Sequence, residues 1–268
     1  MVAPRSQQYA HTRLLEAGNL IFLYRPRPGV IHPRSSTDIA QTAITLLPDN
    51  QTQHPNRLFI FPSCVFPPIV EGQNLPEEQG FAYTSAVSVQ PRQLIEAVEQ
   101  DTPVPPSPTG PPAPTPARVV GAGRYVIALQ NSETYLAYAL GQPSQLGAAQ
   151  QTVLLDQCGV FKMRVLEPAL PTPVTVAGSP DYPHDLGDRF DGHVSIPADP
   201  VQLLDYQWTR IVLFGQTTNL QGFGVSVDPT VENQSSRHAF QQLDRDRGPI
   251  ESLYQVDICK PMETGELE

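Results

Sequence analysis

Short apolar segments separated by turn residues recur along the chain, and this pattern predicts β-strands rather than long helices. Residues 19–25 (NLIFLYR) form a nearly continuous apolar run, typical of a buried strand, which Pro26 and Pro28 end. Further strands of the first part are predicted over residues 41–47, 57–61 and 81–89, and a helix is predicted from Pro91 to Gln100.

A second series of strands follows, and its brief polar turns favour antiparallel pairing. These strands are predicted over residues 124–129, 134–140, 151–156, 160–167 and 209–214, the last ended by Gly215. Asp199-Pro200 is typical of a helix start, because Asp199 can cap free N–H groups and proline suits the first helical position. The predicted fold class is α+β, mainly antiparallel β in a sandwich- or barrel-like arrangement, with a few short helices.

A proline-rich segment, residues 102–116 (TPVPPSPTGPPAPTP), interrupts the strands. Proline fixes φ and has no N–H, so this segment is predicted to be a polyproline II linker or loop outside any sheet. It divides the chain into residues 1–101, a strand-rich region with a closing helix, and residues 117–268, a β-meander region with short helices. The pattern leaves open whether these are two domains or one domain with an insertion.

Charge and cysteine content narrow the possible partners and the compartment. The net charge of −10 disfavours a nucleic-acid partner, since phosphates must be met by Lys and Arg. No stretch approaches the roughly 20 apolar residues of a membrane span, and residues 1–10 lack the apolar core of an export signal. Cys64, Cys158 and Cys259 are far apart and form no Cys-x-x-Cys pair. We therefore expect free thiols in a reducing compartment, and a cytoplasmic protein.

The strongest candidate for metal chemistry is the segment from Asp181 to His193 (DYPHDLGDRFDGH). Two histidines among carboxylates suit zinc, iron or manganese by ligand type. The candidate ligands are His184, Asp185, Asp188 and His193. If the segment is helical, the first three of these share one face with Asp181. The alternative is a solvated acidic segment, and because no spacing matches a known motif we expect no metal and no other cofactor.

Two further pieces superficially suggest chemistry. Ser63-Cys64 could supply a nucleophile, but the sequence shows no base beside it, and a packed thiol is the commoner state of cysteine. Residues 121–123 (GAG) lack the third glycine, the lysine and the helix of a phosphate loop, so we interpret them as a turn. With no nucleophile-elbow, zincin or Walker motif, we assign no catalytic or cofactor-binding residue.

Three pieces in order resemble a bacterial family of proteins without an established activity. They are residues 18–30 (GNLIFLYRPRPGV), 123–143 (GRYVIALQNSETYLAYALGQP) and 196–215 (IPADPVQLLDYQWTRIVLFG). The family's corresponding pieces are a Tyr-Arg-Pro strand end, an LAYAL strand and a PADP-x-x-LLDY helix start. The resemblance implies structural roles, with Asp199 as a helix cap, and no activity. The long proline insertion departs from the family's shorter pattern, which implies that the fold does not need it.

Three functions from different classes remain. The leading hypothesis is a non-enzymatic interaction or regulatory module whose partner is another protein. The alternative is a metal-dependent, hydrolase-like enzyme built on Asp181 to His193. A third is a small-molecule-binding β domain with a pocket between sheets. The oligomeric state is left open.

Overall fold

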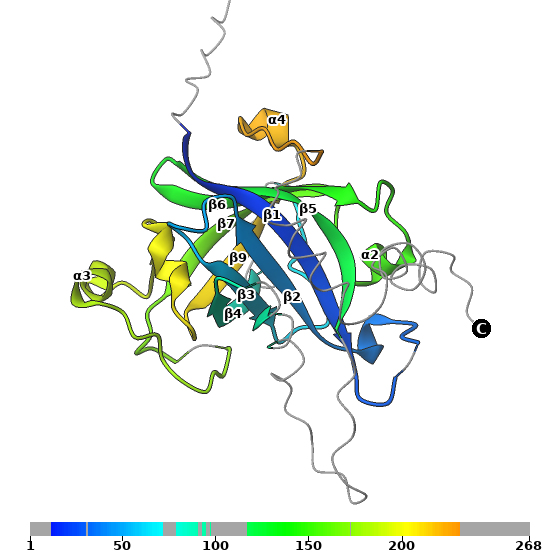
Figure 1. Ribbon diagram of the computed structural model, residues 1–268, viewed down its shortest axis with the longest axis horizontal. Coiled ribbons are helices and arrows are strands. Elements are labelled where there is room, and N and C mark those ends of the chain that lie inside the picture. Colours follow the sequence, from blue (N-terminus) through cyan, green and yellow to red (C-terminus); the bar gives the residue numbers. More distant parts are fainter. Residues whose placement is uncertain are drawn as a thin grey trace, which may run out of the picture.

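The protein folds into a closed antiparallel barrel (Figure 1). The structure, a computed structural model, describes residues 12–30, 32–71, 79–90, 93–94, 97, 117–171 and 173–230. The strand order is β6-β5-β1-β2-β3-β4-β9-β7-β8, and β6 also pairs with β7, so eight strands close the barrel while β8 pairs only with β7. The predicted fold class, mainly antiparallel and barrel-like, is confirmed.

The elements are short apart from the two longest strands. The strands are β1 (Arg13–Pro26), β2 (Ile39–Pro48), β3 (Asn56–Phe61), β4 (Gln79–Ser88), β5 (Arg118–Gln130), β6 (Glu133–Gln142), β7 (Cys158–Leu166), β8 (Ser195–Pro197) and β9 (Arg210–Thr217). The α-helices are α2 (Ala148–Thr152), α3 (His184–Gly187) and α4 (Leu220–Phe223). The 3₁₀ helices are η1 (Ser36–Asp38), η3 (Asp188–Phe190) and η4 (Val201–Asp205).

Aromatic side chains fill the barrel interior. Alternation along each strand sends every second side chain inward, and several of the inward ones are large. The Phe22 ring lies 5.0 Å from Phe66 and 4.9 Å from Tyr138, and Tyr138 lies 5.9 Å from Phe161, measured between ring centroids. All four are at most 2% exposed. The interior is therefore a packed core.

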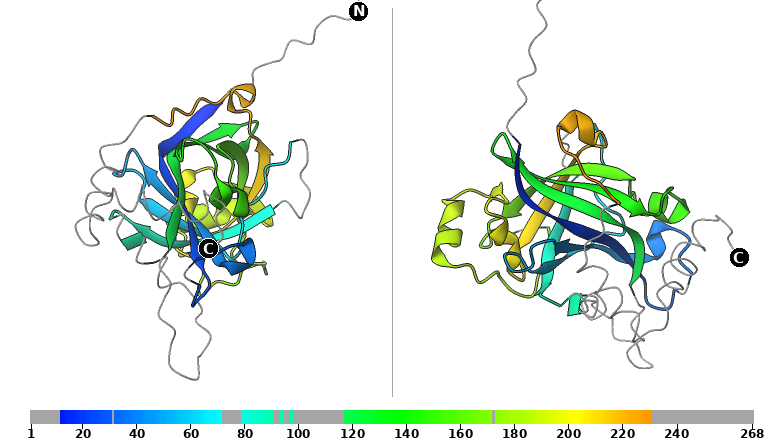
Figure 2. Two further views of the ribbon diagram at one scale, coloured as in Figure 1. Left: turned by 90° about the vertical axis from the view of Figure 1, so that its right-hand side faces the viewer. Right: turned by 45° about the horizontal axis from the view of Figure 1, so that its top comes forward.

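The two barrel ends are closed by different pieces of chain. At one end the loop carrying Phe66 hydrogen-bonds through its backbone N–H to the carbonyl of Val153, just after α2. At the other end η4 inserts Leu203 and Leu204, which have no exposed surface. Figures 1 and 2 show α2 and α3 at these opposite ends.

The strand predicted over residues 151–156 is wrong, because its first part is the end of helix α2. The Gln150 side chain accepts a hydrogen bond from the backbone N–H of Gly147 at 2.7 Å, which favours a helical turn. Residues 153–155 are apolar, which led to the strand prediction. Val153 and Leu155 instead pack against the barrel end and form no strand.

Two smaller predictions are also corrected. Asp199 does not cap a helix: it pairs with Arg13 at 3.0 Å, and Pro200 is the residue that precedes η4. Gly215 does not end its strand, because β9 continues to Thr217. The close approach of the loop at Pro68 explains the glycine, since a Cβ there would lie 2.1 Å from the Pro68 carbonyl oxygen.

Strands from both sides of the proline-rich segment share one core. β1 to β4 precede residues 102–116 and β5 to β9 follow them, yet all belong to the same nine-stranded sheet. The segment itself lies outside the described residues, as does most of the helix predicted over residues 91–100. Among the described residues, no helix is long and apolar enough to cross a membrane.

A second, smaller core covers the outer face of β1 to β4. It contains outward-facing strand residues together with Leu94 and Val174, and Val176 and Trp208 pack against it. Val174 belongs to the chain between β7 and α3, which therefore crosses the outside of the barrel. This crossing positions the candidate site described below.

Candidate functional site

Five polar side chains meet at the barrel end that η4 closes, and we call them the mouth cluster: Glu16, His54, Arg57, Tyr125 and Asp205. Arg57 has no exposed surface. Its Nη1 lies 2.7 Å from Glu16 Oε1, and its Nε lies 2.6 Å from Asp205 Oδ1. The Tyr125 hydroxyl donates to Glu16 Oε1 at 2.6 Å. A fully buried charge needs pairing of this kind.

Burial and mutual charge shift the pKa values in the mouth cluster. Burial alone would lower the pKa of Arg57, but the charges of Glu16 and Asp205 more than reverse this and raise it. Burial raises the pKa of Asp205, and the Arg57 charge opposes that rise. Burial raises the pKa of Tyr125 well above its ordinary value, and the charge of Glu16 adds to the rise. Tyr125 therefore stays a neutral donor and Arg57 stays charged.

His54 completes the mouth cluster without a hydrogen bond through Nδ1. This nitrogen lies 3.6 Å from Glu16 Oε2 and 3.7 Å from Asp205 Oδ2, and it has no hydrogen-bond partner among the described residues. Both carboxylates already bind Arg57. The mouth cluster thus satisfies its own charges, and we interpret it as the polar closure of the barrel.

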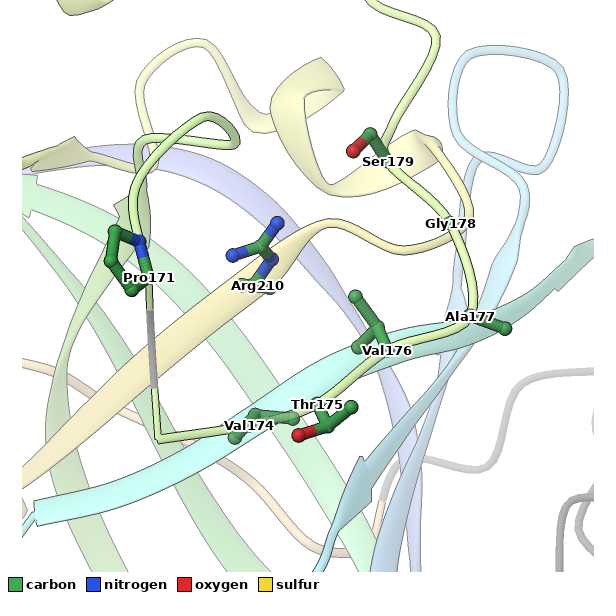
Figure 3. Close-up of a pocket in the computed structure, with 8 residues that line it drawn as sticks. All are labelled: Pro171, Val174, Thr175, Val176, Ala177, Gly178, Ser179 and Arg210. Carbon is green, nitrogen blue, oxygen red and sulfur yellow. The ribbon is translucent and has the colours of Figure 1, made fainter.

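The second site is an open cleft on the outer wall, which we call the wall cleft (Figure 3). Its volume is about 430 Å³, and it is lined by Pro171, Val174, Thr175, Val176, Ala177, Gly178, Ser179 and Arg210. Arg210 comes from β9, where Ile211 and Leu213 point inward, so strand alternation turns Arg210 outward. Its guanidinium stands between Pro171 and the run from Val176 to Ser179.

Arg210 is held by the loop that it faces. Its Nη1 donates to the carbonyl of Leu170 at 2.9 Å, and its Nη2 donates to the carbonyl of Pro168 at 2.7 Å. Both acceptors are backbone carbonyls, and the two bonds orient the guanidinium. The cleft therefore has a guanidinium of fixed orientation on its wall.

Residues 175–179 form the opposite wall of the cleft and leave their backbone groups unpaired. Thr175, Ala177 and Ser179 are exposed, while Val176 and Gly178 are half-buried against the barrel. This alternation is typical of extended chain, although the chain bends at Ala177 and Gly178. No hydrogen bond joins the backbone of these residues to another group in the described part of the chain.

Trp208 lies beneath this wall and is the single tryptophan of the chain. Its ring stacks on Tyr83 with 6.0 Å between centroids. A Cβ placed on Gly178 would lie 2.7 Å from two atoms of the indole, so only glycine lets the wall approach so closely. Trp208 also has a φ of 71°, and a bulky residue in this region is a strained outlier of the kind found near functional sites.

The structure places three of the predicted metal ligands, His184, Asp185 and Asp188, on the exposed turns of α3 and η3, and the fourth, His193, just after η3. His184 Nδ1 lies 2.6 Å from Asp188 Oδ2, and His193 Nδ1 lies 2.9 Å from the carbonyl oxygen of Phe190. Asp185 joins neither pair. No group of three or more His, Cys, Asp or Glu side chains placed to hold a metal occurs among the described residues. The single face expected for a continuous helix does not form, since α3 spans only four residues.

The structure gives the other two candidate pieces, Ser63-Cys64 and residues 121–123, roles in the fold. The Ser63 hydroxyl accepts from the backbone N–H of Val65, and Cys64 is half-buried against the core. Residues 121–123 were predicted to be a turn, but they lie within strand β5. A Cβ on Gly123 would lie 2.0 Å from the Ala139 carbonyl oxygen, so glycine serves the close approach of β6.

Comparison of the chain with protein-family models, with curated proteins and with solved structures finds no match. The function must therefore be argued from the geometry of this chain.

Sequence reasoning missed both sites. Glu16 and Arg57 come together only through the register of three strands, which no local pattern reveals. Arg210 was within reach, because its alternation with Ile211 and Leu213 predicts that it faces away from the core. The loop that meets it could not be predicted, since the prolines from 168 onwards signal only an end to regular structure.

Proposed function

We infer that this protein is a non-enzymatic binding module that takes an extended segment of another protein into the wall cleft. The observation that carries the proposal is the row of unpaired backbone groups over residues 175–179, along one side of an open cleft. Unpaired backbone N–H and C=O groups are a template for an added strand. Five fully extended residues would rise about 16 Å, and the bend at Ala177 and Gly178 makes the wall available to a bound segment somewhat shorter.

The other two functions have less support from the geometry. A small-molecule carrier of the barrel type needs a hollow interior, whereas aromatic rings fill this one. A hydrolase built on Asp181 to His193 needs converging ligands, whereas His184 and His193 bond to different partners. No observation favours either function over the binding module.

The proposal includes a reducing, cytoplasmic setting. Cys64 and Cys158 are both free thiols, which supports that setting. The third cysteine, Cys259, lies outside the described residues.

The test selects random displayed peptides on the full-length protein and measures binding of synthesised hits by Trp208 fluorescence. Each hit is then N-methylated at one backbone position at a time. Because alternate residues of an added strand point their N–H groups at the partner, binding should fall at every second position and persist between them. If no peptide binds, or if no periodicity of two appears, the proposed function is wrong.

A pair of variants locates the binding. Ser179→Phe places a bulky ring where the Ser179 hydroxyl faces the cleft, and it should abolish binding. Gln202→Phe adds the same ring at an exposed position of η4, outside the cleft, and should leave binding unchanged. Equal binding by both variants would place the peptide elsewhere and refute the assignment.

A further inference from the structure

We propose that His54 is a proton-operated latch on the barrel end that η4 closes. In its protonated form His54 balances the charge of the mouth cluster and joins β1 to η4. In its neutral form it leaves one buried negative charge there without a counter-charge. The latch concerns the closure of the barrel and is independent of the proposed binding in the wall cleft.

His54 lies in the turn between β2 and β3, at a point where three parts of the fold meet. Its backbone N–H donates to the carbonyl of Asn50 at 3.0 Å, which holds the turn. Its Nδ1 lies 3.6 Å from Glu16 Oε2 on β1 and 3.7 Å from Asp205 Oδ2 on η4. The residue is only 8% exposed, and Nδ1 has no hydrogen-bond partner in the described part of the chain. Buried polar atoms are rarely left in this state, so the position of the ring between two carboxylates needs an explanation.

The charges of the mouth cluster balance only when His54 is protonated. Arg57 supplies one positive charge and binds two carboxylates, those of Glu16 and Asp205. With a neutral His54, one negative charge is therefore in excess. With a protonated His54, the two positive and two negative charges are equal. Burial of an uncompensated charge is unfavourable, so the surroundings favour the protonated ring.

The other ionisable groups around the cluster do not supply the missing charge. Tyr125 reaches Glu16 from β5 and is neutral, because burial raises the pKa of its hydroxyl well above its ordinary value. Asp49, at the start of the turn that holds His54, is acidic and pairs with Arg124 of β5 at 2.6 Å. His54 is thus the member of the mouth cluster that can provide a second positive charge.

The contact with Asp205 connects the proton to the closure of the barrel. Burial raises the pKa of Asp205, whereas the charges of Arg57 and His54 lower it. Asp205 is the last residue of η4, and Leu203 and Leu204 of the same helix close the barrel end. A protonated His54 therefore holds η4 against β1 and the β2–β3 turn, and loss of the proton weakens this attachment.

The direction of the pH dependence follows from the protonated state. In an unfolded chain a histidine loses its proton near pH 6.5. Because the latch favours the protonated ring in the folded chain, its contribution to stability is fully present below about this pH. The contribution is lost as the pH rises above it.

The test measures the stability of the full-length protein by urea unfolding between about pH 5.5 and 8.5. The ratio of folded to unfolded protein should fall as the pH rises above about 6.5, by up to about tenfold per pH unit for this one proton. His54→Gln keeps a polar side chain that takes up no proton, and it should lose this part of the slope. His193→Gln removes an exposed histidine outside the mouth cluster and should keep the slope of the unaltered protein.

A second variant keeps the latch testable if His54→Gln does not fold. Asp205→Asn removes one negative charge but retains an oxygen for Arg57, so Arg57 alone balances Glu16. In an NMR titration of the histidine rings, the transition of one ring, that of His54, should move to lower pH in Asp205→Asn.

Two results would overturn the latch. The first is a slope of stability against pH that is the same in His54→Gln and in the unaltered protein. If Asp205→Asn alone loses that slope, the excess proton belongs to Asp205. The second is an NMR titration of Asp205→Asn in which no histidine ring changes its transition.

Discussion

Two arginines of the barrel wall, Arg57 on β3 and Arg210 on β9, have opposite surroundings. Arg57 points into the barrel end, is fully buried, and binds the carboxylates of Glu16 and Asp205. Arg210 points outward, is partly exposed, and is oriented by two backbone carbonyls. Burial forces the first to be paired with charge, because an isolated buried ion is very unfavourable. The comparison assigns stability to the mouth cluster, whereas the wall cleft carries the proposed binding.

The largest expected effect is that of removing the buried guanidinium. Arg57→Met keeps an apolar stem but leaves Glu16 and Asp205 buried without their partner, so the free energy of unfolding should fall by about 3–5 kcal/mol. Arg210→Met is the matched control, and it should cost clearly less, because Arg210 is partly exposed and the two backbone carbonyls that it leaves carry no net charge. Urea unfolding of both variants measures the difference. Similar losses in both variants would erase the distinction between the two sites.

A smaller effect is expected from the hydroxyl that supports Glu16. Tyr125→Phe removes a buried hydrogen bond to a carboxylate and should cost about 1.5–3 kcal/mol. Tyr138→Phe is the control, because the Tyr138 hydroxyl donates to the neutral carbonyl of Asp156 at 3.1 Å and should contribute only about 0.5–1.5 kcal/mol. Equal costs for the two variants would show that the charge of Glu16 does not strengthen its bond to Tyr125.

Unfolding at alkaline pH tests the burial of Tyr125 and Tyr138 without a mutation. Burial raises the pKa of Tyr125, with the charge of Glu16 adding to the rise, and burial raises the pKa of Tyr138. In the unfolded chain both tyrosines lose their protons near pH 10, whereas the folded chain keeps them. Stability is therefore fully present below about pH 10 and falls above it, by up to about 1.4 kcal/mol per pH unit for each tyrosine.

The measurement is urea unfolding between pH 9 and 11, with tyrosinate absorbance followed on the folded protein. Tyr125→Phe should reduce the slope of stability against pH in this range. An unchanged slope, or tyrosinate absorbance from all tyrosines near pH 10, would contradict the buried, neutral state of Tyr125.

The sequence allowed most of the strands to be predicted, but it did not allow the segments that connect them to be predicted. Runs such as residues 19–25 and 57–61 predicted β1 and β3 because a short apolar run bounded by turn residues is a local signal. The strand prediction over residues 151–156 was wrong because an apolar run has the same sequence pattern in a strand and in a segment that closes a barrel end. Only the three-dimensional contact of Val153 with the core distinguishes these two cases.

The sites were harder to predict for a related reason. The candidate ligands from His184 to His193 were found because they lie close together in sequence, but sequence proximity did not bring them to one point in space. The mouth cluster joins residues from β1, the turn before β3, β3, β5 and η4, so most of its members are distant in sequence and each looks like an ordinary surface residue. The sequence does not show which of its charged residues a closed sheet will bury.

The smallest expected effect concerns the wall of the cleft, and it tests whether that wall depends on Gly178. Gly178→Ala places a methyl group 2.7 Å from the indole of Trp208, so the wall must shift outward. The cost in stability should be about 1 kcal/mol, because the wall is a surface segment without backbone hydrogen bonds to break. Gly187→Ala is the control: its added Cβ meets nothing within 4 Å, and the position has helical dihedral angles, so stability should be unchanged or slightly higher. Trp208 emission should shift to longer wavelength in Gly178→Ala alone, and the selected peptides should bind this variant more weakly. An unshifted emission with full peptide binding would mean that the wall does not rest on Trp208, and the cleft would then need another explanation for its shape.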